Sequence, residues 1–226
     1  MVEAENLEIE VLTKGIAPEE PIEVRIEKLA DLFSKNLKDK ISDRVELMKE
    51  DDKSHYLIYK VLGIADKEGD LIDVYQNKGR FLYKYAGSFL ESAAILCFQE
   101  KNKDAQVKLK IPNTIGQRPK TFEIDCLVKN NAYEIKWRDA TTDGDHITKE
   151  HTRLKNIQLA GYTPIRIMFY YPNREQAIRI QQTLKTLYLG SGGQYYFGDE
   201  AWAHILKETG VDLNGILTKI ADKRKC

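Results

Sequence analysis

Cysteine is scarce in this sequence, and its few cysteines form no recognisable site. The 226 residues include Cys97, Cys126 and Cys226, an odd number without CxxC spacing. This usage argues against a disulfide framework and against a zinc site. Long apolar runs are also lacking: no stretch approaches the roughly eighteen residues of a membrane span, and no leader-like segment opens the chain. These absences predict a cytoplasmic protein without a membrane segment.

An excess of either charge is lacking as well. Lys plus Arg and Asp plus Glu number 35 each, and the sequence pI is about 6.9. No global positive field therefore points to a polyanionic partner, and any nucleic-acid surface must be local. The segment from Lys101 to Lys120 is the clearest local candidate, with six basic residues against Asp104 alone. It predicts either phosphate contacts or a solvated charged face.

Helical spacing of apolar residues dominates the first hundred residues. It predicts one or two amphipathic helices over Ile22–Glu50, suited to a scaffold or a dimer surface. The short alternating run at Leu7–Leu12 is left open, and His55–Ile64 fits a helix or a strand. A stronger helix is predicted over Gly79–Lys101, with Glu91 in its middle.

A β-hairpin is predicted next, and it carries charges where strands usually do not. Residues 121–128 alternate, so that Asp125 shares a face with Glu123 and Leu127. The other face takes the apolar residues Phe122, Ile124, Cys126 and Val128. After an asparagine-containing turn, Ala132–Trp137 forms the second strand, on which Glu134 and Lys136 share a face. In this register Asp125, Glu134 and Lys136 converge on one patch.

A strand, helix, strand unit continues from the hairpin. Asp145 is a candidate cap for a helix over His146–Ala160, which Gly161 would end. The apolar run Pro164–Tyr171 then predicts a strand parallel to Ala132–Trp137, because such a crossover joins parallel neighbours.

The last part of the chain is predicted to be mostly helical. Asn173 and Gln176 have capping-box spacing before a helix that reaches about Leu189. We expect a flexible loop at residues 190–198, which lacks the lysine of a phosphate-binding P-loop, and a helix over residues 201–223.

Two carboxylates and a lysine on adjacent strands suit metal-assisted phosphodiester hydrolysis. Hard oxygen ligands hold Mg²⁺, which lowers the pKa of bound water, and a lysine can orient that water or offset charge on phosphorus. The backbone carbonyl of Ile135 would add a ligand. The alternative is that Glu134 and Lys136 form an exposed ion pair worth less than about 1 kcal/mol, which leaves Asp125 unexplained. The spacing alone recurs at Asp51-Asp52-Lys53, where no strand surrounds it.

The order helix, strand, strand, helix, strand over Gly79–Tyr171 resembles the PD-(D/E)xK nuclease superfamily, and within it the type II restriction endonucleases. The segment YEIKWRDATTDGDHITKEHTR carries the closest likeness. By this resemblance Asp125 and Glu134 bind the metal, Lys136 is the catalytic lysine and Glu91 is an accessory acid, although a helix glutamate is often simply solvated. Ile124 stands where the family has a proline.

The segment that follows Lys136 is crowded with hydrogen-bonding side chains. Mixed donors and acceptors of this kind read base edges, whereas phosphate binding alone calls for plain Lys and Arg. Lys149, Thr152, Arg153 and Asn156 have the spacing of one polar helix face, which is either a DNA-reading surface or a solvated one. The candidate DNA-binding residues are Arg138, Asp139, Thr141, Thr142, Asp143, Asp145, His146, Lys149, Thr152, Arg153 and Asn156.

The fold expected is α/β: a restriction-endonuclease-like core with a mixed β-sheet flanked by helices, and additional N- and C-terminal helices. We expect a single nuclease domain with a mainly helical extension (1–78), a catalytic core (79–189), and a loop and C-terminal helix (190–226).

The function predicted is a Mg²⁺-dependent type II restriction endonuclease that leaves 5′-phosphates, with Mn²⁺ as a substitute. Its partners would be double-stranded DNA and a second copy of the chain, because palindromic sites favour two-fold symmetry. A cognate DNA methyltransferase is expected in the same system, without a stable complex. The alternatives are another nuclease of this superfamily, such as a junction resolvase or repair nuclease, and a non-catalytic DNA-binding protein.

Overall fold

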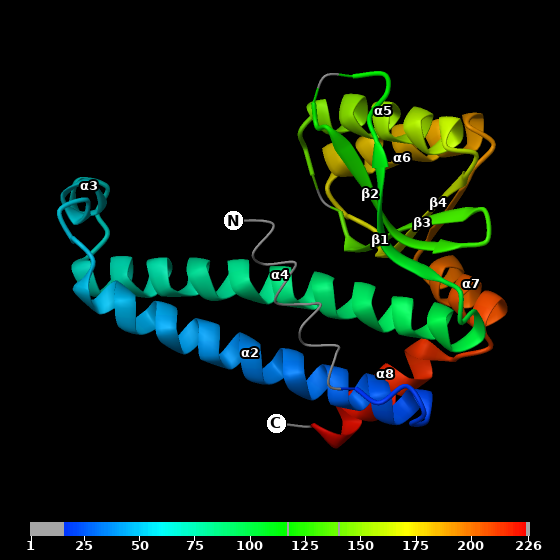
Figure 1. Ribbon diagram of the computed structural model, residues 1–226. Helices are drawn as coiled ribbons and strands as arrows, with labels where there is room; N and C mark the ends of the chain where they lie inside the picture. Colours follow the sequence, from blue (N-terminus) through cyan, green and yellow to red (C-terminus); the bar gives the residue numbers. More distant parts are fainter. Residues whose placement is uncertain (1–15, 117, 140, 225–226) are drawn as a thin grey trace. The chain divides into compact units, whose positions relative to one another are not determined.

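The computed structural model describes residues 16–116, 118–139 and 141–224 (Figure 1). Of these, residues 16–19 and 27–89 form one compact unit, and residues 20–26 and 90–224 form the other. The run at Leu7–Leu12 lies outside the described residues. No helix in the described ranges is long and apolar enough to cross a membrane.

The first unit is built from α2 (Ile22–Glu50), α3 (Tyr56–Val61) and α4 (Asp66–Lys101), of which α2 and α4 continue into the second unit. α2 is one unbroken helix. The segment His55–Ile64, which fitted a helix or a strand, contains the helix α3. α4 begins at Asp66, well before the expected Gly79. Asp66 and Glu68 in its first turn favour a helix start. The apolar pattern did not predict this start because the first two turns carry no buried apolar stripe. The expected boundary between residues 78 and 79 falls inside this helix.

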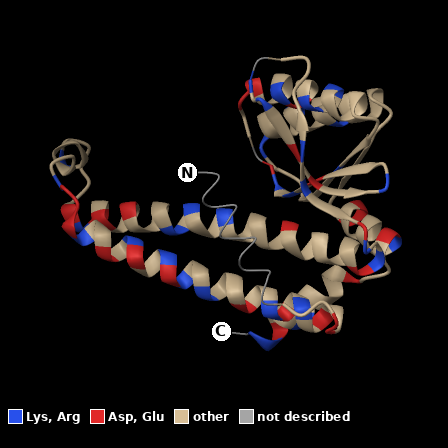
Figure 2. Ribbon diagram, viewed as in Figure 1, with Lys and Arg blue, Asp and Glu red and all other residues tan. Residues whose placement is uncertain are grey.

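Many large apolar side chains of the first unit are exposed to solvent. Phe33 packs edge-on against Tyr85 and Phe89, with ring centroids 6.2 and 5.8 Å away. On and just after α3, by contrast, Val61 and Leu62 are 73% and 71% exposed. Lys, Arg, Asp and Glu are interspersed along α2 (Figure 2). The unit therefore presents a surface of mixed charge with apolar side chains at α3.

The second unit contains a mixed five-stranded sheet in the order β1-β2-β3-β4-β5. β1 pairs with β2, and β2 with β3, in antiparallel fashion, whereas β3, β4 and β5 are parallel. The α/β fold and the hairpin with its parallel continuation are therefore confirmed. The strands are β1 (Gln106–Pro112), β2 (Thr121–Val128), β3 (Asn131–Arg138), β4 (Thr163–Tyr170) and β5 (Gln194–Phe197).

Helices cover both faces of this sheet (Figure 1). One face packs against α5 and α6 through a buried cluster that includes Leu154, Met168 and Leu184. The other face receives the end of α4 and α7: the rings of Phe98 and Tyr133, and those of Phe169 and Trp202, lie 4.3 Å apart. The helices of this unit are α5 (Asp145–Leu159), α6 (Glu175–Gly190), α7 (Asp199–Thr209) and α8 (Leu213–Lys223).

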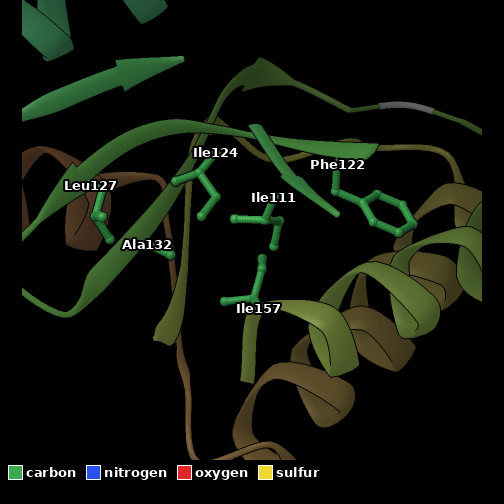
Figure 3. Close-up of a cluster of buried hydrophobic side chains, with 6 residues drawn as sticks. All are labelled: Ile111, Phe122, Ile124, Leu127, Ala132 and Ile157. Atoms are coloured by element: carbon green, nitrogen blue, oxygen red, sulfur yellow. The ribbon is translucent and has the colours of Figure 1, made fainter. Parts of the chain in front are cut away.

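A second apolar cluster joins β1, β2 and the start of β3 to α5, and it corrects the predicted alternation. Ile124 and Leu127 were expected on opposite faces of β2, yet both belong to this cluster (Figure 3). The regular side-chain period therefore slips between them. The residue level with Asp125 on β1 is Lys108, whose φ of 53° departs from strand geometry at the same place.

Several predicted helix ends are also corrected. Asp145 is the first residue of α5 rather than its cap, and its N–H donates to the Asp143 carboxylate. Gly161, with φ of 84°, follows α5 as predicted. The capping box at Asn173 and Gln176 is not formed, because Gln176 donates to the carbonyl of Thr142 instead.

The C-terminal stretch differs from the prediction in two places. The expected loop 190–198 contains strand β5, which gains backbone hydrogen bonds from β4. The expected helix 201–223 is two helices, α7 and α8, separated at Gly210, whose φ of 77° favours glycine.

The tight entry into β5 makes a prediction about Gly193. A Cβ atom there would lie 2.3 Å from the carbonyl oxygen of Pro164 and 3.0 Å from that of Tyr188. We expect Gly193→Ala to lower the free energy of unfolding by roughly 2–3 kcal/mol, because backbone must move to relieve the overlap. Gly190→Ala is the matched control, since a Cβ at Gly190 meets no atom within 4 Å. Urea unfolding of the three proteins checks this, and equal stability of the two variants would contradict it.

Candidate active site

The site lies where β2 and β3 separate. Their backbones pair only near the turn, from Val128 with Asn131 to Cys126 with Tyr133. The next facing positions are Asp125 and Glu134, and there the pairing stops. The N–H of Ile135 donates instead to Oδ2 of Asp125, at 2.8 Å. A buried carboxylate thus takes the place of a strand carbonyl, which positions Asp125 beside the Glu134–Lys136 segment.

Lys108 contacts three carboxylates, one of which is Asp125. Its Nζ lies 3.1 Å from Asp125 Oδ1 and 3.2 Å from Glu123 Oε1, and it also donates to Oε1 of Glu91 on α4. We call Glu91, Glu123 and Asp125 the acid cluster. The three hydrogens of one ammonium thus face three carboxylates. Glu91 and Asp125 were expected in one site, and the structure joins them through Lys108, which the sequence patterns did not single out.

The backbone of Lys108 is unusual for a strand. Its φ of 53° is in the left-handed region, which costs a non-glycine residue about 1–2 kcal/mol. The neighbouring pairs Val107 with Cys126 and Leu109 with Ile124 keep their register on either side. The distortion is therefore confined to the residue whose side chain enters the acid cluster.

Glu134 is held by cations on both oxygens. Lys136 Nζ lies 2.7 Å from Oε1, and Arg153 of α5 pairs with Oε2. Arg153 also donates to the carbonyl of Glu123 at 2.8 Å, so it spans from β3 to β2 across their separation. The side chains of Glu134 and Arg153 are each only 9% exposed. The Glu134–Arg153 pair is therefore a buried ionic contact. The Glu134–Lys136 pair weighed as an alternative is formed as well, with Glu134 buried and the lysine side chain 37% exposed.

These contacts shift the pKa values of the site. Burial disfavours the charged form of Glu134, but Arg153 and Lys136 outweigh it and hold the pKa of this carboxyl well below its usual range. Burial likewise opposes the charge of Lys136, yet Glu134 and Asp125 raise its pKa above the ordinary value. Burial and the charge of Asp125 raise the pKa of Glu91 to about 7. Lys136 is therefore a cation at neutral pH.

The ionic contacts continue away from Glu134 on the face of the sheet that packs against α5 and α6. Arg153 lies 3.3 Å from Glu150, and Glu150 lies 3.6 Å from Arg166 of β4. Arg166 in turn contacts Asp139 at 2.6 Å, and Asp139 contacts His146 at 3.1 Å. The hydroxyl of Tyr188 on α6 donates to Glu150 at 2.6 Å. A line of alternating charges therefore runs from Lys136 to the segment after β3, and we call it the buried ionic network.

The candidate DNA-binding residues divide into a buried, a partly buried and an exposed group. Arg153 and Asn156 are buried, at 7% and 2% exposure, so the single polar face expected on α5 is not present. Asn156 binds the N–H of Thr114, 2.7 Å from its Oδ1. Asp139 and His146 are partly buried in the ionic network, and Thr141 and Thr152 are partly buried as well. The exposed members are Arg138, Thr142, Asp143, Asp145 and Lys149.

The donor chemistry at β2 and β3 fits a divalent metal, but its carboxylates are committed to protein cations. Asp125 and Glu134 supply the hard oxygens that Mg²⁺ prefers, and Ile135 lies between them in the chain. Within the described ranges, no three Asp, Glu, His or Cys side chains are placed to hold an ion together. A metal must therefore compete with Lys108, Lys136 or Arg153.

Some of the missed residues carried a signal in the sequence. Arg166 interrupts the apolar run of β4, just as Asp125 interrupts that of β2. A charge inside an apolar strand is unfavourable without a partner, so Arg166 could have been selected on the same ground as Asp125. Lys108 carried no such signal. It alternates regularly with Val107 and Leu109, which places it on the same face as the exposed Lys110.

The ionic network predicts a stability that depends on pH. We expect Asp139→Asn to lower the free energy of unfolding at pH 7 by about 3 kcal/mol, because it leaves the fully buried Arg166 without its closest anion. Burial opposes the charge of Asp139, but its hydrogen bond to His146 and the charge of Arg166 outweigh this and place its pKa below the ordinary value. A lowered carboxyl pKa stabilises above the unfolded pKa of about 4, and the effect is lost as pH falls further.

Urea unfolding of both proteins between pH 7 and pH 3 measures this difference. It should shrink below about pH 4. Asp143→Asn, in the same segment but exposed, is the control and should change stability little. A difference that stays constant down to pH 3 would contradict the assignment.

The sequence model of the ApaLI-like restriction endonuclease family matches residues 13–222, which include the sheet, the site and the flanking helices. No curated protein and no solved structure matches the chain. The predictions of a type II restriction endonuclease and of its fold are confirmed, and restriction endonucleases of this kind generally use a divalent metal. The chain belongs to the ApaLI-like restriction endonuclease family and is a type II restriction enzyme, an endodeoxyribonuclease that binds double-stranded DNA.

Proposed function

We propose that this enzyme uses Mg²⁺ to hydrolyse both strands of double-stranded DNA at a short specific sequence, leaving 5′-phosphate and 3′-hydroxyl ends. Mn²⁺ would substitute for Mg²⁺. The observation that carries the proposal is the meeting of Asp125 with Glu134 where β2 and β3 part, with Lys136 against Glu134 at 2.7 Å. Two carboxylates and a cation at a break in strand pairing suit a metal and a phosphate together.

Asp125 and Glu134 would hold the metal, with the carbonyl of Ile135 as a further ligand. When bound, Mg²⁺ polarises the scissile phosphate and lowers the pKa of a bound water. The hydrogen bond from the Ile135 N–H to Asp125 supports this assignment, because it fixes the aspartate beside the Glu134–Ile135 backbone before any metal arrives.

Lys136 would stabilise negative charge that develops on the phosphate. Its pKa is raised by Glu134 and Asp125 against the effect of burial, so the ammonium does not act as a base at neutral pH. Its side chain is 37% exposed and can reach a bound phosphate from the open side. Glu91 would act as the accessory acid, since its pKa of about 7 lets it exchange a proton near neutral pH.

Base recognition would fall to the exposed part of the segment after β3. Arg138, Asp143, Asp145 and Lys149 offer donors and acceptors of both kinds at the surface. Arg153, Asn156 and the partly buried Thr152 would instead support the surface from beneath. Asp139, Thr141, Thr142 and His146 complete the proposed segment, with Asp139 and His146 holding its shape.

We further propose that the enzyme acts as a homodimer in the cytoplasm, beside a DNA methyltransferase that protects the host sites without a stable complex. The exposed apolar side chains at α3 support a self-association surface, because contiguous apolar patches mark interaction sites. Two rival functions remain for comparison: a junction-resolving or repair nuclease that reads DNA shape, and a DNA-binding protein without catalysis. The burial of Asp125 and Glu134 on adjacent strands, with Lys136 paired to Glu134, favours an enzyme over the second rival.

Cleavage of a large unmethylated phage DNA with Mg²⁺ tests the proposal. Discrete bands are expected with the unaltered protein, and none with EDTA. Asp125→Asn and Lys136→Ala should each lower the rate on the order of a hundredfold or more, because the first weakens the proposed metal site and the second removes the charge beside the phosphate. Lys155→Ala on the exposed face of α5 is the control and should cleave normally.

The other outcomes separate the rivals. A smear of products would favour the shape-reading nuclease. Intact DNA in every lane would favour the non-catalytic binder. Full cleavage by Asp125→Asn would remove the metal site from this position.

The proposed dimer makes a separate prediction. Sedimentation equilibrium should give twice the chain mass of 26.0 kDa. We expect Leu62→Asp, at a site 71% exposed in the first unit, to shift the protein toward monomer. Leu189→Asp, at a site 54% exposed in the second unit, is the matched control and should remain dimeric. A monomeric unaltered protein, or dissociation by the control alone, would exclude this surface.

A further inference from the structure

The acid cluster already contains a cation of its own. Three carboxylates from α4 and β2 surround the ammonium of Lys108, and 24% of the lysine side chain is exposed. Two of these acids belong to the proposed catalytic group. An ammonium in contact with three carboxylates occupies the kind of position that a hard divalent ion takes in an oxygen-lined site.

The backbone of β1 is distorted at this one residue. A regular strand would hold Lys108 with the same geometry as its neighbours, whereas the left-handed φ of 53° is a costly conformation for a lysine. The three ionic contacts are the compensation visible in the structure. The distortion is thus tied to delivering a positive charge to the acid cluster.

The remaining acid, Glu134, lies outside the reach of Lys108. Its two oxygens face Lys136 and Arg153 instead. Asp125 is shared, since Oδ1 faces Lys108 and Oδ2 faces the backbone of Ile135. Lys108 therefore balances the charge of the acid cluster, whereas Lys136 and Arg153 balance the charge of Glu134.

We propose that Lys108 is a positioning residue that serves as a resident cation: it fills one cation position of the acid cluster, so that each chain takes a single exchangeable divalent ion. This inference rests on the proposed metal-dependent function. The single ion is held from the Asp125–Glu134 side. The lysine keeps Glu91, Glu123 and Asp125 together when no metal is bound.

Mn²⁺ binding to the full-length protein without DNA tests the inference. Free Mn²⁺ measured by electron paramagnetic resonance should give one ion per chain for the unaltered protein. In the unaltered protein the three carboxylates are not placed to hold an ion together. Lys108→Met removes the ammonium that separates them, so that they can close on an ion, and the variant should bind one additional Mn²⁺. Lys108→Arg keeps a cation there and should bind as the unaltered protein does.

Thermal unfolding supplies a second readout. In EDTA, Lys108→Met should melt below the unaltered protein, and saturating Mn²⁺ should raise its midpoint by more than it raises that of the unaltered protein. Lys110→Met is the matched control on the same strand, at an exposed position, and should show neither effect. A lysine with only a structural role would lower the melting temperature without any gain in Mn²⁺ binding.

Two results would overturn the inference: Lys108→Met that binds no more Mn²⁺ than the unaltered protein, or an unaltered protein that already binds two ions per chain. The second result does not depend on the folding of any variant. Failure of the proposed function is recognised separately, because the purified protein would then leave DNA intact with Mg²⁺ while the Mn²⁺ stoichiometry is still measured.

Discussion

The buried ionic network is the constraint on which the catalytic half of the molecule depends. It joins two strands, a helix and a surface segment through charges of alternating sign. Removing such charges from water costs several kcal/mol for each ion, so each is tolerated only because a partner of opposite sign is adjacent. The register of β3 against β4 meets this need for an adjacent opposite charge, because it sets Glu134 beside Arg166. Its charged members are Lys136, Glu134, Arg153, Glu150, Arg166 and Asp139, and the ring of His146 contacts Asp139 at its end.

The same network connects the proposed chemistry to the proposed recognition segment. Glu134 lies near one end and Asp139 with His146 at the other, and a continuous series of ionic contacts joins them. Arg153 is central, because it contacts Glu134, Glu150 and the carbonyl of Glu123 at once. Arginine suits this position since its planar group donates several hydrogen bonds in fixed directions, which a lysine cannot do. The geometry of Glu134 is therefore tied to the shape of the segment after β3.

Local patterns predicted most of the fold, and long-range contacts account for what was missed. The hairpin, α5 and β4 follow from apolar period and turn residues within about fifty consecutive residues, so the meeting of Asp125 and Glu134 could be predicted. The early start of α4 could not, because its first turns lack a buried stripe. Lys108 could not be selected either, since its place in the site depends on a single strained φ angle and on Glu91, which lies 17 residues away in the chain. Arg153 and Asn156 have surface-like spacing, yet both are buried by long-range contacts. Arg153 contacts Glu134 and the carbonyl of Glu123, and Asn156 accepts from the N–H of Thr114.

The identity of each cation indicates which ionic contacts can break when DNA and the proposed metal bind. Arg153 is only 9% exposed and contacts three groups, so its release would leave several partners unsatisfied. Lys136 and Lys108 are 37% and 24% exposed, and a lysine is a point charge on a flexible stem that can pivot toward a phosphate without unfolding a strand. Arg153 is therefore suited to hold the framework in every state. The two lysines are suited to balance the charge of the site, which changes when a metal or a phosphate binds. Because they lie on opposite sides of Asp125, Lys108 can remain with the acid cluster while Lys136 turns to the substrate.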